Sequence, residues 1–491
     1  MPAMGETSMT QAIMSRKHPA VPPDSTDHQR IAESAAAVDG GLLSMSDFHR
    51  WFDERRQAIR MDVQRIPFAD LKRWGFQPVT GNLVHDSGRF FSVEGVQARY
   101  DGQDPVSWSQ PIINQPEVGF LGILVKEIDG VLHCLMQAKA EPGNAEGLQL
   151  SPTVQATRSN YTGVHEGSAV RYLEFFTDPG KGRALIDVLQ SEHGAWFYRK
   201  RNRNLVVEAV GDVPEHEDYC WLTLGQLRRL LGIPDLVNMD TRTVLACLPL
   251  AQAVSPGDGT SDNGLEKGAA ALTASLSQDT PAAHTLPELL RWYNGVRASS
   301  EVSVEPVPLA AVDNWVREAD EIRHTSGRHF TIVAVSVEAG NREVTGWTQP
   351  LLSPRGTGVV AFLAKRINGV LHVLVHAHPE PGYVDVIELG PTVHCVPDNH
   401  THLPPERRPK FLGEVLAARP EQILYDVVQS EEGGRFYRAL SRYMVVEADG
   451  DPVVPDDYRW MTVGQLITLL QHSNYCNIQA RSLIACLQSV W

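Results

Sequence analysis

One short segment carries three polar side chains at alternate positions. Residues 137–143 read QAKAEPG, in which Gln137, Lys139 and Glu141 alternate with alanines before a Pro-Gly pair ends the segment. In a β-strand this alternation puts the three polar side chains on one face. An amine and a carboxylate on one wall of a pocket could transfer protons and stabilise an anion. The alternative is a solvated sheet edge, where Lys139 and Glu141 simply neutralise each other.

A second polar segment follows at residues 151–161, SPTVQATRSNY. Gln155 and Thr157 alternate with apolar residues, which is typical of a strand with a second polar face. The next four residues are expected in a loop, where guanidinium, amide and phenol groups could bind a diphosphate and sugar hydroxyls; they are Arg158, Ser159, Asn160 and Tyr161. Ordinary turn chemistry of Ser and Asn explains the same loop equally well.

Aromatic and arginine side chains supply further candidates for nucleotide binding. Trp51 and Trp108 could stack on a base, although most such aromatic residues belong to a core. Gln110 shares the motif SWSQP with Trp108. Arg89, in SGRFFSV, could contact phosphate or form a surface ion pair.

Every one of these motifs belongs to a unit that is written twice. Trp108 in SWSQP and Trp347 in GWTQP lie 239 residues apart, and the same offset joins KEIDGVLHCL to KRINGVLHVL and WLTLGQLRRLL to WMTVGQLITLL. A unit of about 200 residues is domain-sized, far longer than a solenoid repeat. We therefore expect a disordered segment at 1–42, a first repeat at 43–250, a flexible linker at 251–284 and a second repeat at 285–491.

The second copy changes the polar residues but keeps the frame. HAHPEPG replaces QAKAEPG, so that His376 and His378 replace the amide and the amine, while Glu380 persists. The remaining residues of this second pocket are His394 in place of Gln155, with Asn399, Trp347 and Arg328. Histidines with a carboxylate could bind a metal ion. Because the first copy has no such set, we interpret them as substituted pocket residues and expect no metal.

The elements that carry these residues alternate in type. Residues 47–59 have helical spacing, and residues 119–143 predict a β-hairpin that turns at Asp129-Gly130, a pair suited to a type I′ turn. Residues 183–192 and 223–232 are predicted helices, the second opened by Thr223 and closed by Gly232. Strands interleaved with helices indicate a mixed α+β sandwich.

The bulk properties exclude several classes of protein. The net charge of −15 over 491 residues disfavours general binding to nucleic acid or anionic membranes. There is no apolar run long enough for a membrane span and no apolar core of a secretory signal near the start. The six cysteines form no CxxC pair, which is typical of reduced thiols in a cytoplasmic protein. The motifs GxGxxG after a strand, P-loop, GxSxG and HExxH are absent, which disfavours a dehydrogenase, kinase or serine hydrolase.

The motifs SWSQP and GWTQP, QAKAEPGN and SPTVQATRSNY, together with the duplication, resemble the NDP-hexose 2,3-dehydratases of deoxysugar biosynthesis in antibiotic-producing actinomycetes. The resemblance covers the chain from about residue 45 to the end, apart from the linker. It implies a tandem of Nudix-like α/β/α sandwich domains, commonly a homodimer, that binds a dTDP-sugar without hydrolysing it. The absence of a Nudix box, which would hold catalytic Mg²⁺, is consistent with this.

The substrate that the resemblance implies is dTDP-4-keto-6-deoxy-α-D-glucose, converted by loss of water across C2 and C3 to dTDP-3,4-diketo-2,6-dideoxy-glucose. The C4 ketone acidifies the C3 proton, so a single base suffices and no cofactor is expected. From side-chain chemistry we predict Glu141 as acid or base and Lys139 as enolate stabiliser or alternative base. Substrate binding is predicted for Gln137, Gln155, Thr157, Arg158, Ser159, Asn160, Tyr161, Trp108, Gln110, Trp51 and Arg89.

Several alternatives remain open at this point. The histidines of the second copy could be the catalytic set, although we favour the first copy. The chain could instead be a non-catalytic nucleotide-sugar binding protein or, least favoured, a Nudix-type pyrophosphatase. The expected partners are the dTDP-sugar, a second copy of the chain and a downstream 3-ketoreductase, with neither nucleic acid nor membrane.

Overall fold

The computed structural model describes residues 25–39, 41–100, 106–157, 170–249, 264–277, 280–340, 345–487 and 489. Within these ranges, no helix is both long and apolar enough to cross a membrane.

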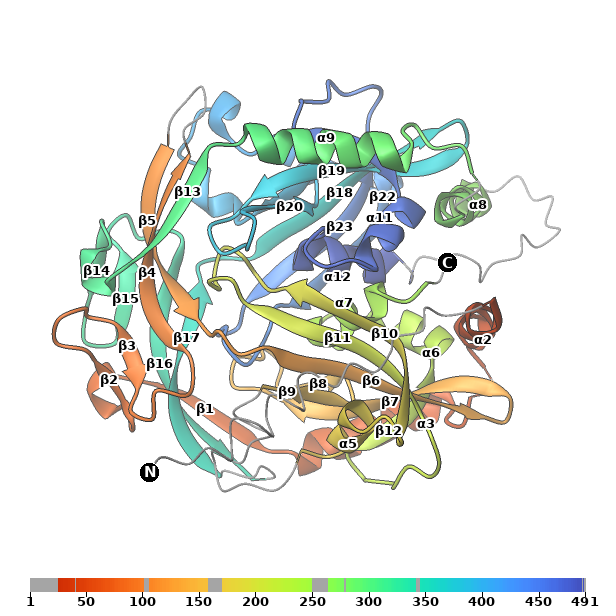
Figure 1. The fold of residues 1–491 in the computed structure, drawn as a ribbon, viewed down its shortest axis with the longest axis horizontal. Coiled ribbons are helices and arrows are strands. Elements are labelled where there is room, and N and C mark those ends of the chain that lie inside the picture. The colour runs from red at the N-terminus through yellow and green to blue at the C-terminus, as the bar shows by residue number, and fades with distance from the viewer. Residues whose placement is uncertain are drawn as a thin grey trace.

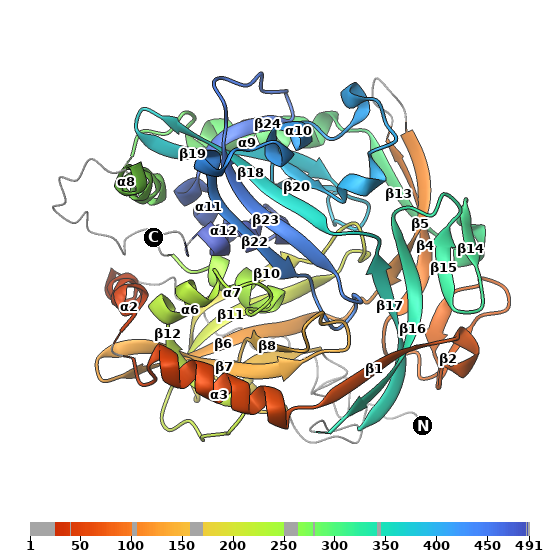
Figure 2. The same ribbon diagram turned by 180° about the vertical axis from the view of Figure 1, so that it is seen from behind.

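Each repeat contains one large mixed sheet (Figures 1 and 2). In the first repeat the strands are β6 (Gly119–Ile128), β7 (Val131–Ala140), β8 (Leu148–Ser151), β9 (Val154–Ala156), β10 (Gly182–Ser191), β11 (Arg201–Ala209) and β12 (Tyr219–Thr223). In the second they are β18 (Gly358–Ile367), β19 (Val370–Pro379), β20 (Ile387–Gly390), β21 (Val393–Cys395), β22 (Ile423–Ser430), β23 (Leu440–Glu447) and β24 (Tyr458–Thr462). The order β10-β11-β6-β7-β12 recurs as β22-β23-β18-β19-β24, with β11 and β6 parallel.

Helices cover both faces of each large sheet. In the first repeat α2 (Ser25–Ala36), α6 (Leu224–Leu230) and α7 (Met239–Ala246) pack on one face, and α5 (Leu173–Thr177) packs on the other. Their counterparts are α8 (Gly264–Leu276), α11 (Val463–Leu470), α12 (Ile478–Leu487) and α10 (Leu412–Leu416). The long helices α3 (Met45–Ala58) and α9 (Leu286–Ser299) lie outside these layers and pack against the main core. The layering is helix–sheet–helix.

Local sequence chemistry explains two of the predicted elements. Asp129 and Gly130 have φ of 51° and 80°, as the predicted type I′ turn between β6 and β7 requires. Thr223 caps α6 in a capping box with Gln226, which confirms the predicted start of that helix.

The prediction of a helix at residues 183–192 is wrong. This segment is β10, antiparallel to β11. Ala184 packs into the core on one face of the sheet and Ile186 into the core on the other. A strand buried on both faces has a continuous apolar run, and periodicity alone does not distinguish such a run from a buried helix.

Two smaller antiparallel sheets join the repeats by exchanging a strand. One consists of β2 (Trp74–Phe76), β3 (Leu83–His85), β4 (Ser92–Tyr100), β5 (Val106–Asn114) and β13 (Val302–Val307). The other consists of β1 (Met61–Ile66), β14 (Trp315–Arg317), β15 (Glu321–His324), β16 (Phe330–Ala339) and β17 (Gly346–Pro354). Figure 1 shows the green β13 beside the orange β4, and Figure 2 shows β1 beside the teal β16. Each repeat therefore supplies the edge strand of the other repeat's small sheet.

The segments predicted as disordered terminus and linker each contain an ordered helix. In α2 the Ser34 hydroxyl accepts a hydrogen bond from the Leu224 amide (3.0 Å), and in α8 Ser275 does the same for Val463 (2.9 Å). Ile31 and Leu272 of these helices are buried in the main core. The small, polar composition suggested disorder, but it suits helices that lie close against a sheet. The structural repeat therefore begins upstream of residues 43 and 285.

Candidate active site

The first pocket is built on the end of β7, where Lys139 and Glu141 lie side by side. Lys139 Nζ is 3.1 Å from Glu141 Oε1, and Gln155 Nε2 on β9 donates to the same oxygen at 3.0 Å. The side chains of Lys139 and Glu141 are only 16% and 9% exposed, so the pair is shielded from bulk water. Gln137 is half-buried on the same strand. The structure thus brings Lys139, Glu141 and Gln155 together.

The orientation of Gln155 is set by the start of α7. Asn238 caps that helix through its Oδ1, which accepts from the Thr241 amide at 2.8 Å. Its Nδ2 then donates to Ser151 Oγ at 3.0 Å and to Gln155 Oε1 at 3.4 Å. With its oxygen engaged in this way, Gln155 presents its NH₂ group to Glu141.

A buried carboxyl, Asp240, lies behind this pair in the first turn of α7. Burial raises its pKa well above the ordinary value, and the nearby Glu192, Glu432 and Glu141 add to the effect. Lys139 acts in the opposite direction. Several acidic groups therefore lie near Lys139.

The second repeat completes the first pocket. The Glu432 carboxylate accepts from the Gly434 amide at 2.9 Å through Oε1, while its buried Oε2 has no hydrogen-bond partner among the described residues. Burial raises the pKa of Glu432 to about 7, and Glu141 contributes to the shift. Arg435 donates to Gln115 Oε1 at 3.2 Å and stacks 4.4 Å from the Phe91 ring. Sequence reasoning missed Glu432 and Arg435, because nothing local assigns a loop to the pocket of the other repeat.

A buried lysine adds to the same region. Lys200 is 5% exposed and donates to the Glu117 carbonyl oxygen, and burial lowers its pKa to about 8. Glu192 and Arg435 act on it electrostatically in opposite directions. Glu192 in turn accepts from Asn202 at 2.7 Å.

The Glu-Pro-Gly turns of the two repeats hold the pockets together. The Gly143 amide donates to the Gly433 carbonyl oxygen at 2.7 Å, and the Gly382 amide donates to that of Gly194 at the same distance. A Cβ on Gly143 would lie 1.6 Å from the Phe436 carbonyl oxygen. Glycine is thus required here by close backbone approach between the repeats.

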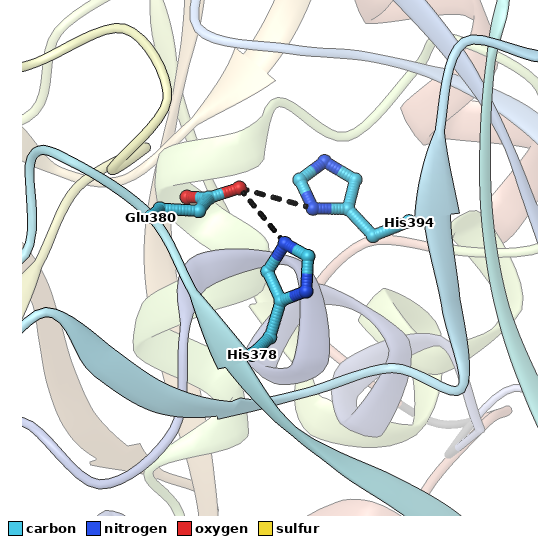
Figure 3. A group of neighbouring side chains, drawn as sticks. All are labelled: His378, Glu380 and His394. Carbon is cyan, nitrogen blue, oxygen red and sulfur yellow. Dashed lines mark ion pairs between the residues drawn. The ribbon is translucent and has the colours of Figure 1, made fainter. Parts of the chain in front are cut away.

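The second pocket has the same frame with different groups. Figure 3 shows His378 and His394 pointing at Glu380, with His378 Nε2 and His394 Nδ1 at 3.4 Å and 3.3 Å from its Oε1. Burial alone would raise the pKa of Glu380, but the two histidines hold that pKa well below its ordinary value. Burial lowers the pKa of His376 to about 4, although the hydrogen bond with Asp457 opposes this.

The structure places Trp108 and Gln110 in the second pocket, which corrects their prediction for the first. Trp108 lines a cavity of about 220 Å³ with Glu380 and Val302. Gln110 donates to the Ala195 carbonyl oxygen at 2.7 Å, next to Gly194. The counterpart of Gln110, Gln349, donates to Gly434 beside Glu141, and its Oε1 accepts from the Trp347 indole at 2.8 Å. The WSQP motif of the first repeat therefore lies at the second pocket, and the WTQP motif of the second repeat lies at the first. Both motifs are on strands of the two small sheets in which the repeats exchange an edge strand.

The other predicted residues serve different roles or lie outside the described residues. The Trp51 indole donates to the Glu217 carbonyl oxygen at 2.8 Å and packs on the core. Arg89 is exposed in the turn between β3 and β4. Asn399 accepts from the amide of His329, the neighbour of Arg328, at 2.8 Å. Thr157 is half-buried just after β9. Four of the predicted substrate-binding residues lie outside the described ranges: Arg158, Ser159, Asn160 and Tyr161.

Comparison with known proteins gives one consistent result. The family model described as NDP-hexose 2,3-dehydratase matches residues 45–248 and again 286–487. A dTDP-4-dehydro-6-deoxy-alpha-D-glucopyranose 2,3-dehydratase of Saccharopolyspora spinosa is 49% identical over 98% of this chain and 99% of its own. Enzymes of the same name from Amycolatopsis orientalis and Streptomyces violaceoruber are 48% and 49% identical, over 95% and 91% of this chain and 95% and 98% of their own.

Proposed function

The chain belongs to the NDP-hexose 2,3-dehydratase family, and from this premise we propose the reaction and its residues. The chain is a hydro-lyase that removes water across C2 and C3 of dTDP-4-keto-6-deoxy-α-D-glucose. The product is dTDP-3,4-diketo-2,6-dideoxy-glucose, an intermediate of deoxysugar biosynthesis.

The chemistry requires three groups. A base removes the C3 proton, and the electron pair moves into an enolate that spans C3 and C4. Collapse of the enolate forms the C2–C3 double bond and expels the C2 hydroxyl, which needs a proton to leave as water. The resulting enol tautomerises, gaining a proton at C2 and forming the C3 ketone. A base, an anion stabiliser and an acid therefore have to face the sugar.

We assign these roles to the first pocket. Glu141 is the base, and Lys139, 3.1 Å away, stabilises the enolate oxygen at C4. Glu432, whose pKa is raised to about 7, retains a proton near neutral pH and gives it to the leaving hydroxyl. The observation that supports this most is the presence of an amine and two carboxyl groups in one shielded site, where one carboxyl, Glu432, has its pKa raised to about 7. The second pocket offers imidazoles around a single carboxylate instead.

Three finer features belong to the same proposal. Each repeat is Nudix-like, in keeping with helices on both faces of a mixed sheet. The working unit is a homodimer in the cytoplasm, where six unpaired cysteines are the ordinary state. The reactive diketone product calls for a 3-ketoreductase that consumes it.

The test is NMR of dTDP-4-keto-6-deoxyglucose in deuterated buffer with the protein, EDTA and no nicotinamide cofactor. We expect deuterium at C2 of a product that lacks the C2 hydroxyl. An unchanged substrate with bound protein would indicate a nucleotide-sugar binding protein. Release of dTMP that requires Mg²⁺ would indicate a pyrophosphatase.

A further inference from the structure

Three potential metal ligands of the second pocket converge on one point. His378 comes from β19, Glu380 from the turn after it and His394 from β21 (Figure 3). One ligand atom from each lies within 4.8 Å of the others. Glu380 is 6% exposed, so little water reaches its carboxylate.

A hydrogen-bonded chain determines which nitrogen of His378 carries its proton. Asp457 Oδ2 lies 3.1 Å from His376 Nε2, and His376 Nδ1 lies 3.2 Å from His378 Nδ1. The carboxylate can only accept, so neutral His376 carries its proton on Nε2 and accepts at Nδ1. A neutral His378 then donates from Nδ1, which leaves the lone pair of its Nε2 facing Glu380 Oε1.

His394 faces the same oxygen. Its Nδ1 is buried and lies 3.3 Å from Glu380 Oε1, a distance at which a protonated imidazole would pair with the carboxylate. Two neutral imidazole nitrogens at 3.4 Å and 3.3 Å from one carboxylate oxygen repel it unless a proton or a metal ion lies between them.

In the first repeat, a lysine side chain supplies the positive charge beside the equivalent carboxylate. There Lys139 takes the place of His378, and its ammonium group lies 3.1 Å from the carboxylate of Glu141. Gln155 takes the place of His394 and donates an N–H to the same carboxylate. The second repeat has neither the amine nor the amide donor, so either a proton on an imidazole or a metal ion has to supply the positive charge.

We propose that His378, Glu380 and His394 bind a divalent transition-metal ion, with Zn²⁺ as the preferred ion. Ligand atoms about 2.0–2.1 Å from a tetrahedral centre are about 3.3–3.4 Å from one another, which are the separations of both histidine nitrogens from Glu380 Oε1. Two imidazoles and one carboxylate leave the fourth position open to water. Asp457 and His376 form the outer chain that orients a ligating histidine. This reverses the expectation of no metal, which rested on the first repeat alone.

The test is Zn²⁺ binding to the full chain, prepared without a histidine tag and stripped with a chelator. Titration against a chromophoric competitor, with metal analysis after dialysis, should give one Zn²⁺ per chain. Co²⁺ at the same site should show the intense visible absorption of tetrahedral coordination. His378→Lys with His394→Gln introduces the residues found in the first repeat, so the variant should fold and lose the ion. His376→Gln should weaken binding by about 10- to 100-fold.

The matched control is His472→Ala, which removes an exposed histidine and should leave binding unchanged. The proposal is overturned if the wild-type chain binds no Zn²⁺, since a proton on one imidazole would then neutralise the cluster. Equal binding by the double variant, or loss of binding in the His472 control, would place the ion elsewhere and overturn it as well. Because binding is read directly, the result does not depend on the proposed dehydration.

Discussion

The backbone amide of Gly143 in the first repeat donates a 2.7 Å hydrogen bond to the carbonyl oxygen of Gly433 in the second. This contact places Glu432 and Arg435 beside the Lys139–Glu141 pair, so the candidate active site is shared between the repeats. The equivalent hydrogen bond, from the Gly382 amide to the Gly194 carbonyl oxygen, joins the first repeat to the second pocket.

Gly143→Ala should destabilise the protein by about 3 kcal/mol, the upper end of overpacking costs. The new Cβ would lie 1.6 Å from the Phe436 carbonyl oxygen, which has no room to move without separating the repeats. Denaturant unfolding measures the loss. Gly295→Ala is the control. A Cβ added at this position inside α9 would meet no neighbouring atom within 4 Å, so the substitution should stabilise the protein by about 0.5–1 kcal/mol.

Glu141→Gln and Lys139→Met should each lower kcat by about 100- to 10,000-fold while dTDP affinity stays within a few fold. Both variants keep side-chain length and remove only the proton-transfer or charge function. Glu380→Gln at the equivalent position of the second repeat is the matched comparison and should retain turnover. Full turnover in both first-repeat variants, with loss in Glu380→Gln, would transfer catalysis to the second pocket.

Glu432→Gln should lower kcat by about 100-fold or more, because the amide cannot give a proton to the leaving hydroxyl. In the wild type, kcat should fall as the pH rises through about 7, where Glu432 loses its proton. The variant should lack this limb of the pH profile. An exposed carboxylate supplies the control, Glu421→Gln, which should leave the profile unchanged.

The same residue makes a prediction about stability with a defined sign. The pKa of Glu432 is raised from 4.5 to about 7 in the folded chain, so between these values the folded state holds a proton that the unfolded state has released. Its contribution to the free energy of unfolding is therefore fully present below pH 4.5 and is lost as the pH rises through 7. The melting temperature of Glu432→Gln minus that of the wild type should therefore be larger at pH 8 than at pH 5. An equal difference at both values would contradict the shifted pKa.

A chain that ends at residue 249 should not fold on its own. It lacks the loop that carries Glu432, and it lacks β13. In the whole chain β13 pairs with β4 over six residues, from Val302 opposite Tyr100 to Val307 opposite Gly95. Circular dichroism during urea titration should show no cooperative transition, and co-expression with residues 264–491 should restore one. A cooperative, active first repeat would show that the strand exchange is dispensable.

The sequence by itself determined what depends on neighbours along the chain. The Asp129-Gly130 turn, the Thr223 cap and the alternation that brings Lys139 to Glu141 are local, and each is present. The duplication is equally visible, because matching motifs recur at a constant offset. The helix predicted at residues 183–192 is instead the strand β10 (Gly182–Ser191), because burial on both faces removes the period that marks a strand.

Only the tertiary structure decided which repeat supplies each pocket. β1 and β13 occupy equivalent positions in two similar repeats, so local preference does not tell whether each pairs within its own repeat or with the other. Pairing with the other repeat carries Trp108 to Glu380 and sets Gln349 beside the loop of Glu432. The choice depends on long-range packing, which the spacing of residues in one repeat does not encode.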